Sequence, residues 1–109
     1  MRVVVTTVVL CAGFAAAAIA QDANVAKGQQ LFTDQKCTLC HSIGDKGNKK
    51  GPLDGVASRL SADDIRAWIT DAKGMIAKTK PTRKPEMKAF SLPKEDVDAL
   101  VAYLSTLKQ

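Results

Sequence analysis

The sequence predicts an all-α fold in which three main helices are joined by loops. Apolar residues recur with the three- and four-residue spacing of a helix in three separate segments of the 109-residue chain. After residue 20 no alternation of polar and apolar residues is long enough for a useful strand, and no internal repeat is present. A chain of this length is expected to form a single domain.

The chain begins with a segment typical of exported proteins. Arg2 precedes an almost uncharged run, residues 3–20, that ends in Ala18-Ile19-Ala20. This order predicts a secretory signal peptide over residues 1–20, cleaved to leave a periplasmic chain of residues 21–109. Because the run approaches the roughly 18 residues of a membrane-spanning helix, an uncleaved anchor that attaches the protein to the membrane is the alternative.

The first main helix is expected to begin at Asp22 or Asn24, since either side chain can cap it, and to run toward the cysteines. Gly28 inside this helix lowers helix propensity by about 1 kcal/mol relative to alanine. A close helix crossing would explain the glycine, and a neutral surface position is the alternative. One side of the helix carries Val25, Gly28, Leu31 and Phe32.

The most specific motif is Cys37-Thr38-Leu39-Cys40-His41. In a C-x-x-C-H run, two thiols can add across the vinyl groups of one haem while the adjacent imidazole reaches the iron, so the spacing predicts c-type haem attachment. A zinc site needs four nitrogen or sulfur ligands, but the chain offers only Cys11 besides this pentad. A redox-active dithiol is the alternative, although the segment before Cys37 reads as a helix rather than a strand.

On this pentad, and on the pattern from about Val25 to Leu107, the chain resembles the class I cytochromes c. The resemblance implies a cytochrome c fold around one covalently attached haem c, which would complete the small hydrophobic core. It also implies that His41 binds the iron and that the carbonyl of Pro52 accepts a hydrogen bond from the second nitrogen of its ring, which would fix the ring. Residues 42–52, rich in glycine and lysine, are expected to form a loop.

A second helix is expected after Ser61, whose hydroxyl can cap it and which two carboxylates follow. Ile65, Trp68 and Ile69 form its inward face. In the resembled family a tryptophan in this region often donates its indole N–H to a haem propionate. Plain packing in the core is the alternative for Trp68.

Two methionines lie in or near residues 73–88, where the pattern favours an irregular loop. Met87, in Pro85-Glu86-Met87, resembles the axial-methionine loop of the family and is the predicted second iron ligand. Met75 is nearer the preceding helix and is expected to fill the core.

The last helix is the most regular segment, with Pro93 at its first turn. The family resemblance implies that this helix crosses the first one, so that Gly28 and Phe32 lie against Leu100 and Tyr103. Its apolar stripe consists of Val97, Leu100, Val101, Leu104 and Leu107.

Iron with a histidine and a thioether ligand has no vacant position for oxygen or peroxide. The resemblance therefore implies a monomeric electron-transfer protein that shuttles single electrons between redox partners and is not an enzyme. A haem subunit of a larger dehydrogenase or oxidase complex is the first alternative. A haem enzyme or gas sensor with an open iron is the second.

The chain carries a formal net charge of +5, which suggests docking to acidic surfaces of redox protein partners; a merely solvated surface is the alternative. Nucleic acid is not expected as a partner, because the charge is modest and aromatic residues are few. The basic residues in question form two groups: Lys78, Lys80, Arg83, Lys84 and Lys88, and Lys46, Lys49 and Lys50.

Overall fold

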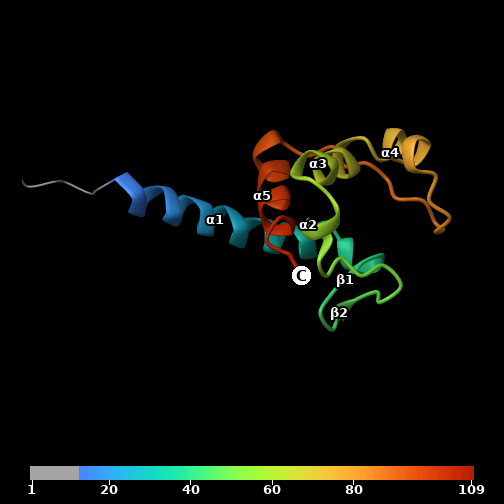
Figure 1. The fold of residues 1–109 in the computed structure, drawn as a ribbon, viewed down its shortest axis with the longest axis horizontal. Coiled ribbons are helices and arrows are strands. Elements are labelled where there is room, and N and C mark those ends of the chain that lie inside the picture. The colour runs from blue at the N-terminus through green and yellow to red at the C-terminus, as the bar shows by residue number, and fades with distance from the viewer. Residues whose placement is uncertain (1–12) are drawn as a thin grey trace, which may run out of the picture.

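The computed structural model describes residues 13–109, with side chains from Gln21 onward. This part of the chain contains five α-helices, one short 3-10 helix and one two-stranded sheet, which confirms the predicted all-α class. Figure 1 shows the later helices gathered into one body, from which the first helix projects. Residues 1–12 of the predicted signal peptide lie outside the described residues, and its cleavage stays a prediction.

Helix α1 (Gly13–Asp34) is longer than predicted. It passes through Asp22 and Asn24 without a break, so neither residue caps it, and the predicted start is wrong. Alanine has the highest helix propensity of any residue, so the alanine-rich segment before these residues lets the helix continue without a cap. After the helix ends, Lys36 adopts a left-handed conformation (φ 59°) that turns the chain toward the cysteines.

Helices α1 and α5 (Lys94–Leu104) cross closely at Gly28, as predicted. A Cβ atom at position 28 would lie 2.7 Å from the Cβ of Tyr103 and would collide with the carbonyl of Ala99. The rings of Phe32 and Tyr103 meet edge to face beside this contact, with their centroids 6.1 Å apart. The crossing explains why a glycine lies in the middle of a helix.

Helix α3 (Ala62–Thr70) begins where the sequence predicts. The hydroxyl of Ser61 accepts a hydrogen bond of 3.1 Å from the backbone N–H of Asp64, and Ile65 and Ile69 are buried. A one-turn helix, α2 (Val56–Arg59), comes before it.

Helix α4 (Ala72–Thr79) lies where the sequence favours an irregular loop, so that prediction is wrong for the first half of residues 73–88. The carboxylate of Asp71 accepts a hydrogen bond of 3.1 Å from the N–H of Gly74 and caps the helix. The backbone from Lys80 onward is non-helical until α5 begins at Lys94. We call residues 80–93 the methionine loop.

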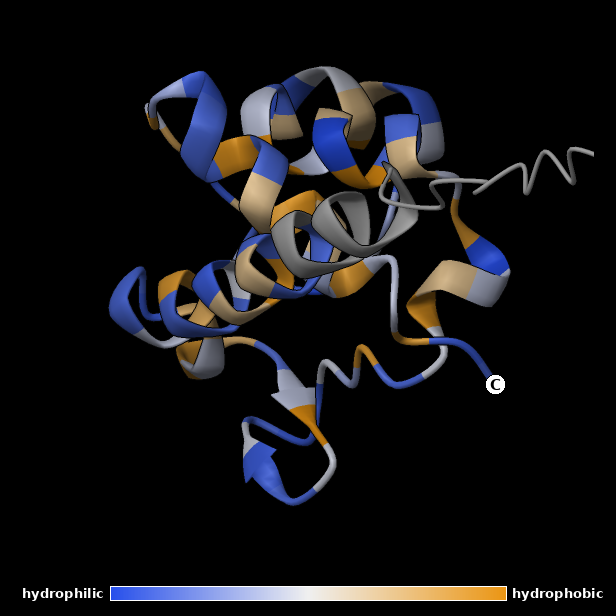
Figure 2. Ribbon diagram, turned by 90° about the vertical axis from the view of Figure 1, so that its left-hand side faces the viewer, coloured by the Kyte–Doolittle hydropathy of each residue, from blue (hydrophilic) through white to orange (hydrophobic). Residues whose placement is uncertain are grey.

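A small hairpin occupies the loop predicted after the pentad. Strands β1 (Ser42–Ile43) and β2 (Lys46–Gly47) pair antiparallel, and Gly44 takes a positive φ of 58° in the turn between them. Figure 2 shows this hairpin apart from the helices and mostly hydrophilic.

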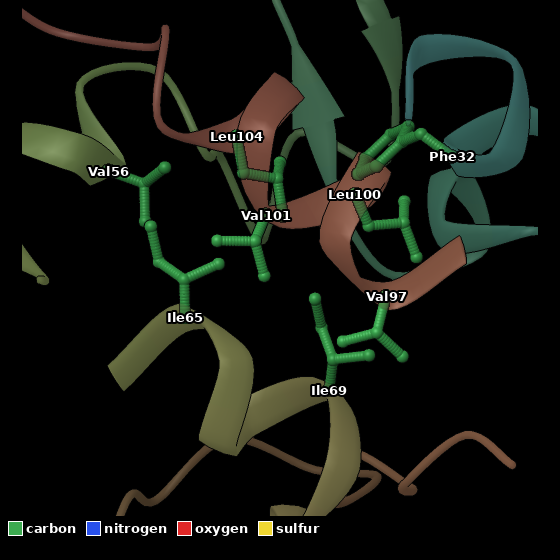
Figure 3. Close-up of a cluster of buried hydrophobic side chains, with 8 residues drawn as sticks. All are labelled: Phe32, Val56, Ile65, Ile69, Val97, Leu100, Val101 and Leu104. Atoms are coloured by element: carbon green, nitrogen blue, oxygen red, sulfur yellow. The ribbon is translucent and has the colours of Figure 1, made fainter. Parts of the chain in front are cut away.

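The hydrophobic core lies where α1, α2, α3 and α5 meet. In Figure 3 side chains of α3 point toward those of α5, with Phe32 of α1 and Val56 of α2 at the sides. The buried cluster consists of Phe32, Val56, Ile65, Ile69, Val97, Leu100, Val101 and Leu104.

Candidate haem site

The pentad folds into a tight turn. Cys37–Leu39 form the 3-10 helix, and the carbonyl of Cys37 accepts hydrogen bonds from the N–H groups of Cys40 (3.2 Å) and His41 (2.9 Å). Both cysteines and the histidine line one cavity. The turn therefore presents two sulfurs and an imidazole to the same space, as haem attachment requires.

Asn48 holds this turn from the outside. Its backbone N–H lies 3.0 Å from the carbonyl of Thr38 and 3.1 Å from that of His41, and its side-chain amide donates to the carbonyl of Leu39 at 3.1 Å. Sequence reasoning missed Asn48, because an asparagine among glycines and lysines reads only as a loop residue. Its role is visible only once residues 38–41 and 48 are brought together.

The ring of His41 is fixed by Gly51 rather than by Pro52, so the predicted carbonyl is wrong by one residue. Nδ1 lies 3.1 Å from the carbonyl oxygen of Gly51. That oxygen faces the ring because it also accepts from the N–H of Ser42 (3.1 Å), while Pro52 forms a bridge with Ser42. A carbonyl only accepts, so the proton is on Nδ1 and the lone pair of Nε2 is left for a metal.

Burial lowers the pKa of His41 below its ordinary value, and the nearby charge of Arg83 acts in the same direction. The hydrogen bond to Gly51 opposes this shift. The imidazole is consequently neutral at neutral pH, which is the form that binds iron.

A cavity of about 510 Å³ lies between the pentad, the core and the methionine loop. Met87 lines it together with His41, whereas Met75 is only 8% exposed and is not among the residues of the wall. The two methionines therefore differ in position as the sequence predicts. Other residues of the wall are mainly apolar and include Leu53, Val56, Ile65, Trp68, Ile76, Phe90 and Leu100.

The pKa of the Cys37 thiol is shifted in the opposite direction from that of a redox-active thiol. Burial raises its pKa to about 11, whereas the nucleophilic cysteine of a dithiol oxidoreductase has a lowered pKa. This argues against the dithiol alternative.

Within residues 13–109 there is no group of three or more His, Cys, Asp or Glu residues that could hold a metal ion.

Trp68 lies on the cavity wall and is partly buried. No hydrogen bond joins its indole N–H to another residue in the part of the chain that the structure describes. Trp68 therefore lies where a haem in the cavity would reach it, and its proximity to the haem and its contact with a propionate stay predictions.

The residues of the cavity fit a covalently attached haem. A large apolar wall accommodates the porphyrin, two thiols at C-x-x-C spacing match its vinyl groups, and an imidazole and a thioether provide nitrogen and sulfur donors.

The Cytochrome c family model matches residues 25–108. The chain belongs to the cytochrome c family. Family membership implies covalently bound haem c and electron transfer.

The chain is also 31% identical, over 91 residues, to cytochrome c oxidase subunit 2 of Alkalihalophilus pseudofirmus. The match covers 75% of this chain and 25% of that protein, so the chain spans about a quarter of the length of this relative. No solved structure matches. Among residues 13–109, no helix is both long and apolar enough to cross a membrane.

Proposed function

We propose that this cytochrome is a periplasmic electron carrier with a single haem c, attached through Cys37 and Cys40 and ligated by His41 and Met87. The observation that carries the proposal is that His41 and Met87 line the same cavity as the two thiols. When bound, the haem supplies one-electron exchange between ferric and ferrous iron. The proposed protein is not an enzyme, because His41 and Met87 would both bind the iron and leave it no free position for a substrate.

The side chains of the cavity each contribute to this exchange. The Gly51 carbonyl keeps the His41 ring in one orientation and raises its basicity as a ligand. The thioether of Met87 would favour the reduced state of a bound iron relative to a second nitrogen donor. The apolar wall would exclude water from the haem, and the same two side chains would hold the iron in both oxidation states, so that electron transfer would require little rearrangement.

A matched pair of methionine variants tests the ligand assignment. In Met87→Ala we expect loss of the sulfur-to-iron charge-transfer band and a lower reduction potential, because water or a weaker donor replaces the thioether. In Met75→Ala we expect the band to persist while the free energy of unfolding falls by about 2–5 kcal/mol, the usual cost of removing a buried methionine side chain. Loss of the band in Met75→Ala alone would reverse the assignment.

Docking to an acidic partner surface is supported by the exposed lysines of α4 and the methionine loop. Lys80, Lys84 and Lys88 are exposed there. Leu39, which precedes Cys40 in the pentad, is a large apolar side chain with 69% of its surface accessible and would add an apolar contact. Arg83, by contrast, is partly buried and donates to the carbonyl of Cys40, so it does not belong with these surface charges.

Salt dependence tests the docking proposal. With ferrocyanide, an anionic reagent, as the electron donor, the rate should fall steeply from low to high ionic strength, since charge steering is screened within about 10 Å at 0.1 M salt. Lys88→Gln should lower the low-salt rate and flatten the salt dependence. A rate that salt leaves unchanged would remove electrostatic docking from the proposal.

A second candidate function is that of a fixed haem subunit in a larger oxidase or dehydrogenase complex. The similarity to a cytochrome c oxidase subunit favours it. Size-exclusion chromatography of a detergent-solubilised native extract, followed by haem absorbance, separates the two candidates. A haem peak at the size of a monomer supports the carrier, and co-elution with a complex supports the subunit.

A further inference from the structure

Arg83 connects the two sides of the cavity. It belongs to the methionine loop, four residues before Met87, and its Nη2 donates a hydrogen bond of 2.6 Å to the carbonyl oxygen of Cys40. Asn48 and the turn's own N–H groups satisfy the other carbonyls of the pentad, so Arg83 is the donor for the remaining one. One side chain of the methionine loop thus completes the hydrogen bonding of the histidine-bearing turn.

Gly51 makes room for this contact. A Cβ atom at position 51 would collide with Nη1 of Arg83 and with the carbonyl oxygen of Cys40. The carbonyl of the same glycine holds the ring of His41. Arg83, Cys40, Gly51 and His41 therefore form one set of direct contacts, which we call the Arg83 cluster.

The charge of Arg83 is not neutralised by an acidic side chain. None of the five ion pairs found in residues 13–109 includes it, and nearby Glu86 pairs with Lys84 at 2.9 Å. A guanidinium is charged at every pH of interest and donates from a rigid planar group, so its position and its charge are both fixed. A fixed positive charge close to His41 would disfavour the extra positive charge of ferric over ferrous iron on a metal bound to that ring.

We propose that Arg83 is a positioning residue, which fastens the Met87-bearing loop to the His41 turn and, through its charge, raises the reduction potential. The proposal rests on the proposed ligation of the iron by His41 and Met87. It makes Arg83 the residue that controls this ligation. Without the Arg83 contact, the loop separates more easily from the turn, and an external ligand replaces the Met87 sulfur more readily.

The test uses the haem-containing protein in three variants. Arg83→Gln removes the charge and weakens the hydrogen bond, Arg83→Lys keeps the charge but lacks the planar donor, and Lys73→Gln on α4 loses one positive charge from an exposed side chain that does not line the cavity. Imidazole affinity of the ferric form is measured from the loss of the charge-transfer band, and the reduction potential by redox titration.

In Arg83→Gln we expect imidazole affinity to rise about tenfold or more, as loss of a charged hydrogen bond implies, and the potential to fall. In Arg83→Lys the affinity should rise while most of the potential is retained. Lys73→Gln should leave the affinity within about twofold of the wild type, because a remote exposed charge contributes little.

Equal imidazole affinity in Arg83→Gln and Lys73→Gln would overturn the proposal. So would a potential that falls equally in those two variants, since net charge alone would then account for it. Failure of the underlying ligand assignment has a different signature: the wild type itself would lack the band, or Met87→Ala would retain it. If Arg83→Gln does not fold, Arg83→Lys still decides the positioning role.

Discussion

The helix crossing and the ligand-bearing segments are held in place by different physics. At the crossing, backbone and rings fit by shape: Gly28 lies against Ala99, and Phe32 against Tyr103. The pentad and the methionine loop are held mainly by directed hydrogen bonds to backbone carbonyls, from Asn48 and Arg83. The energy of close packing is spread over many atom contacts, whereas each directed bond depends on a single donor.

The two regions nevertheless share one core. Most of the buried cluster also forms the wall of the cavity, so packing on one side of these residues is provided by the protein and on the other by the cofactor. A chain of this size buries only about 60–70% of its unfolded surface and has little stability to spare. A well-packed crossing therefore does not complete the fold by itself, because one side of the shared core faces the cavity.

Removal of the haem is the most severe test of this comparison. Protein made without haem, or the double variant Cys37→Ser/Cys40→Ser, should be largely unfolded, because the core then surrounds an empty cavity. Far-ultraviolet circular dichroism should show little helix and no cooperative thermal transition. A helix-rich haem-free form with a sharp transition would show that the crossing suffices, and would break the comparison.

Gly28→Ala sharpens the comparison from the other side. The added methyl group would meet the backbone of Ala99, which cannot move aside as a flexible side chain can. We expect the free energy of unfolding to fall by about 1–3 kcal/mol, measured by denaturant titration of the haem-containing protein, with the charge-transfer band unchanged.

The matched control for this variant is Gln29→Ala, an exposed neighbour on the same helix. It should change the free energy of unfolding by no more than about 0.5 kcal/mol. If Gly28→Ala were equally harmless, the crossing would not be as closely packed as its geometry indicates.

The smallest expected effect concerns charges on the surface of the helical region. Asp98 of α5 bonds to Arg66 (2.7 Å) and Lys94 (2.9 Å), and the hydrogen bonds to Lys94 and then Arg66 lower its pKa below the ordinary 3.8. This contribution to stability is fully present above pH 3.8 and is lost as the pH falls through the lower pKa of the folded protein.

Asp98→Asn should therefore be slightly less stable than the wild type at neutral pH, and the difference should shrink in acid. Thermal unfolding as a function of pH measures it, with Asp22→Asn on α1 as the control. A difference that does not depend on pH would mean that Asp98 contributes through packing rather than charge.

Periodicity was sufficient to predict the apolar faces of α3 and α5, because these depend on residues close together in the sequence. The reason for Gly28 came from the family resemblance, because its neighbours Ala99 and Tyr103 are far along the chain. The start of α1 was predicted wrongly, and α4 was not predicted. The first helix needs no cap at Asp22, and α4 is too short to show a repeating pattern; the capping aspartate, Asp71, was its only signal.

Within the site, the C-x-x-C-H spacing located the cysteines and His41, and the loop context separated Met87 from Met75 in the way the cavity does. The carbonyl of Gly51, in place of Pro52, depends on how Ser42 pairs across the loop, and a difference of one residue leaves no trace in composition. Arg83 looked like one more surface cation. The sequence does not show that its side chain turns inward, because its partner, the carbonyl of Cys40, is far away along the chain.

The sharing of side chains between core and cavity bears on how the protein can be engineered. Within the buried cluster, only Val97 and Val101 do not also line the cavity. Substitutions at the other members would change the melting temperature and the redox midpoint together. These two valines are positions where the melting temperature can be tuned without changing the redox midpoint.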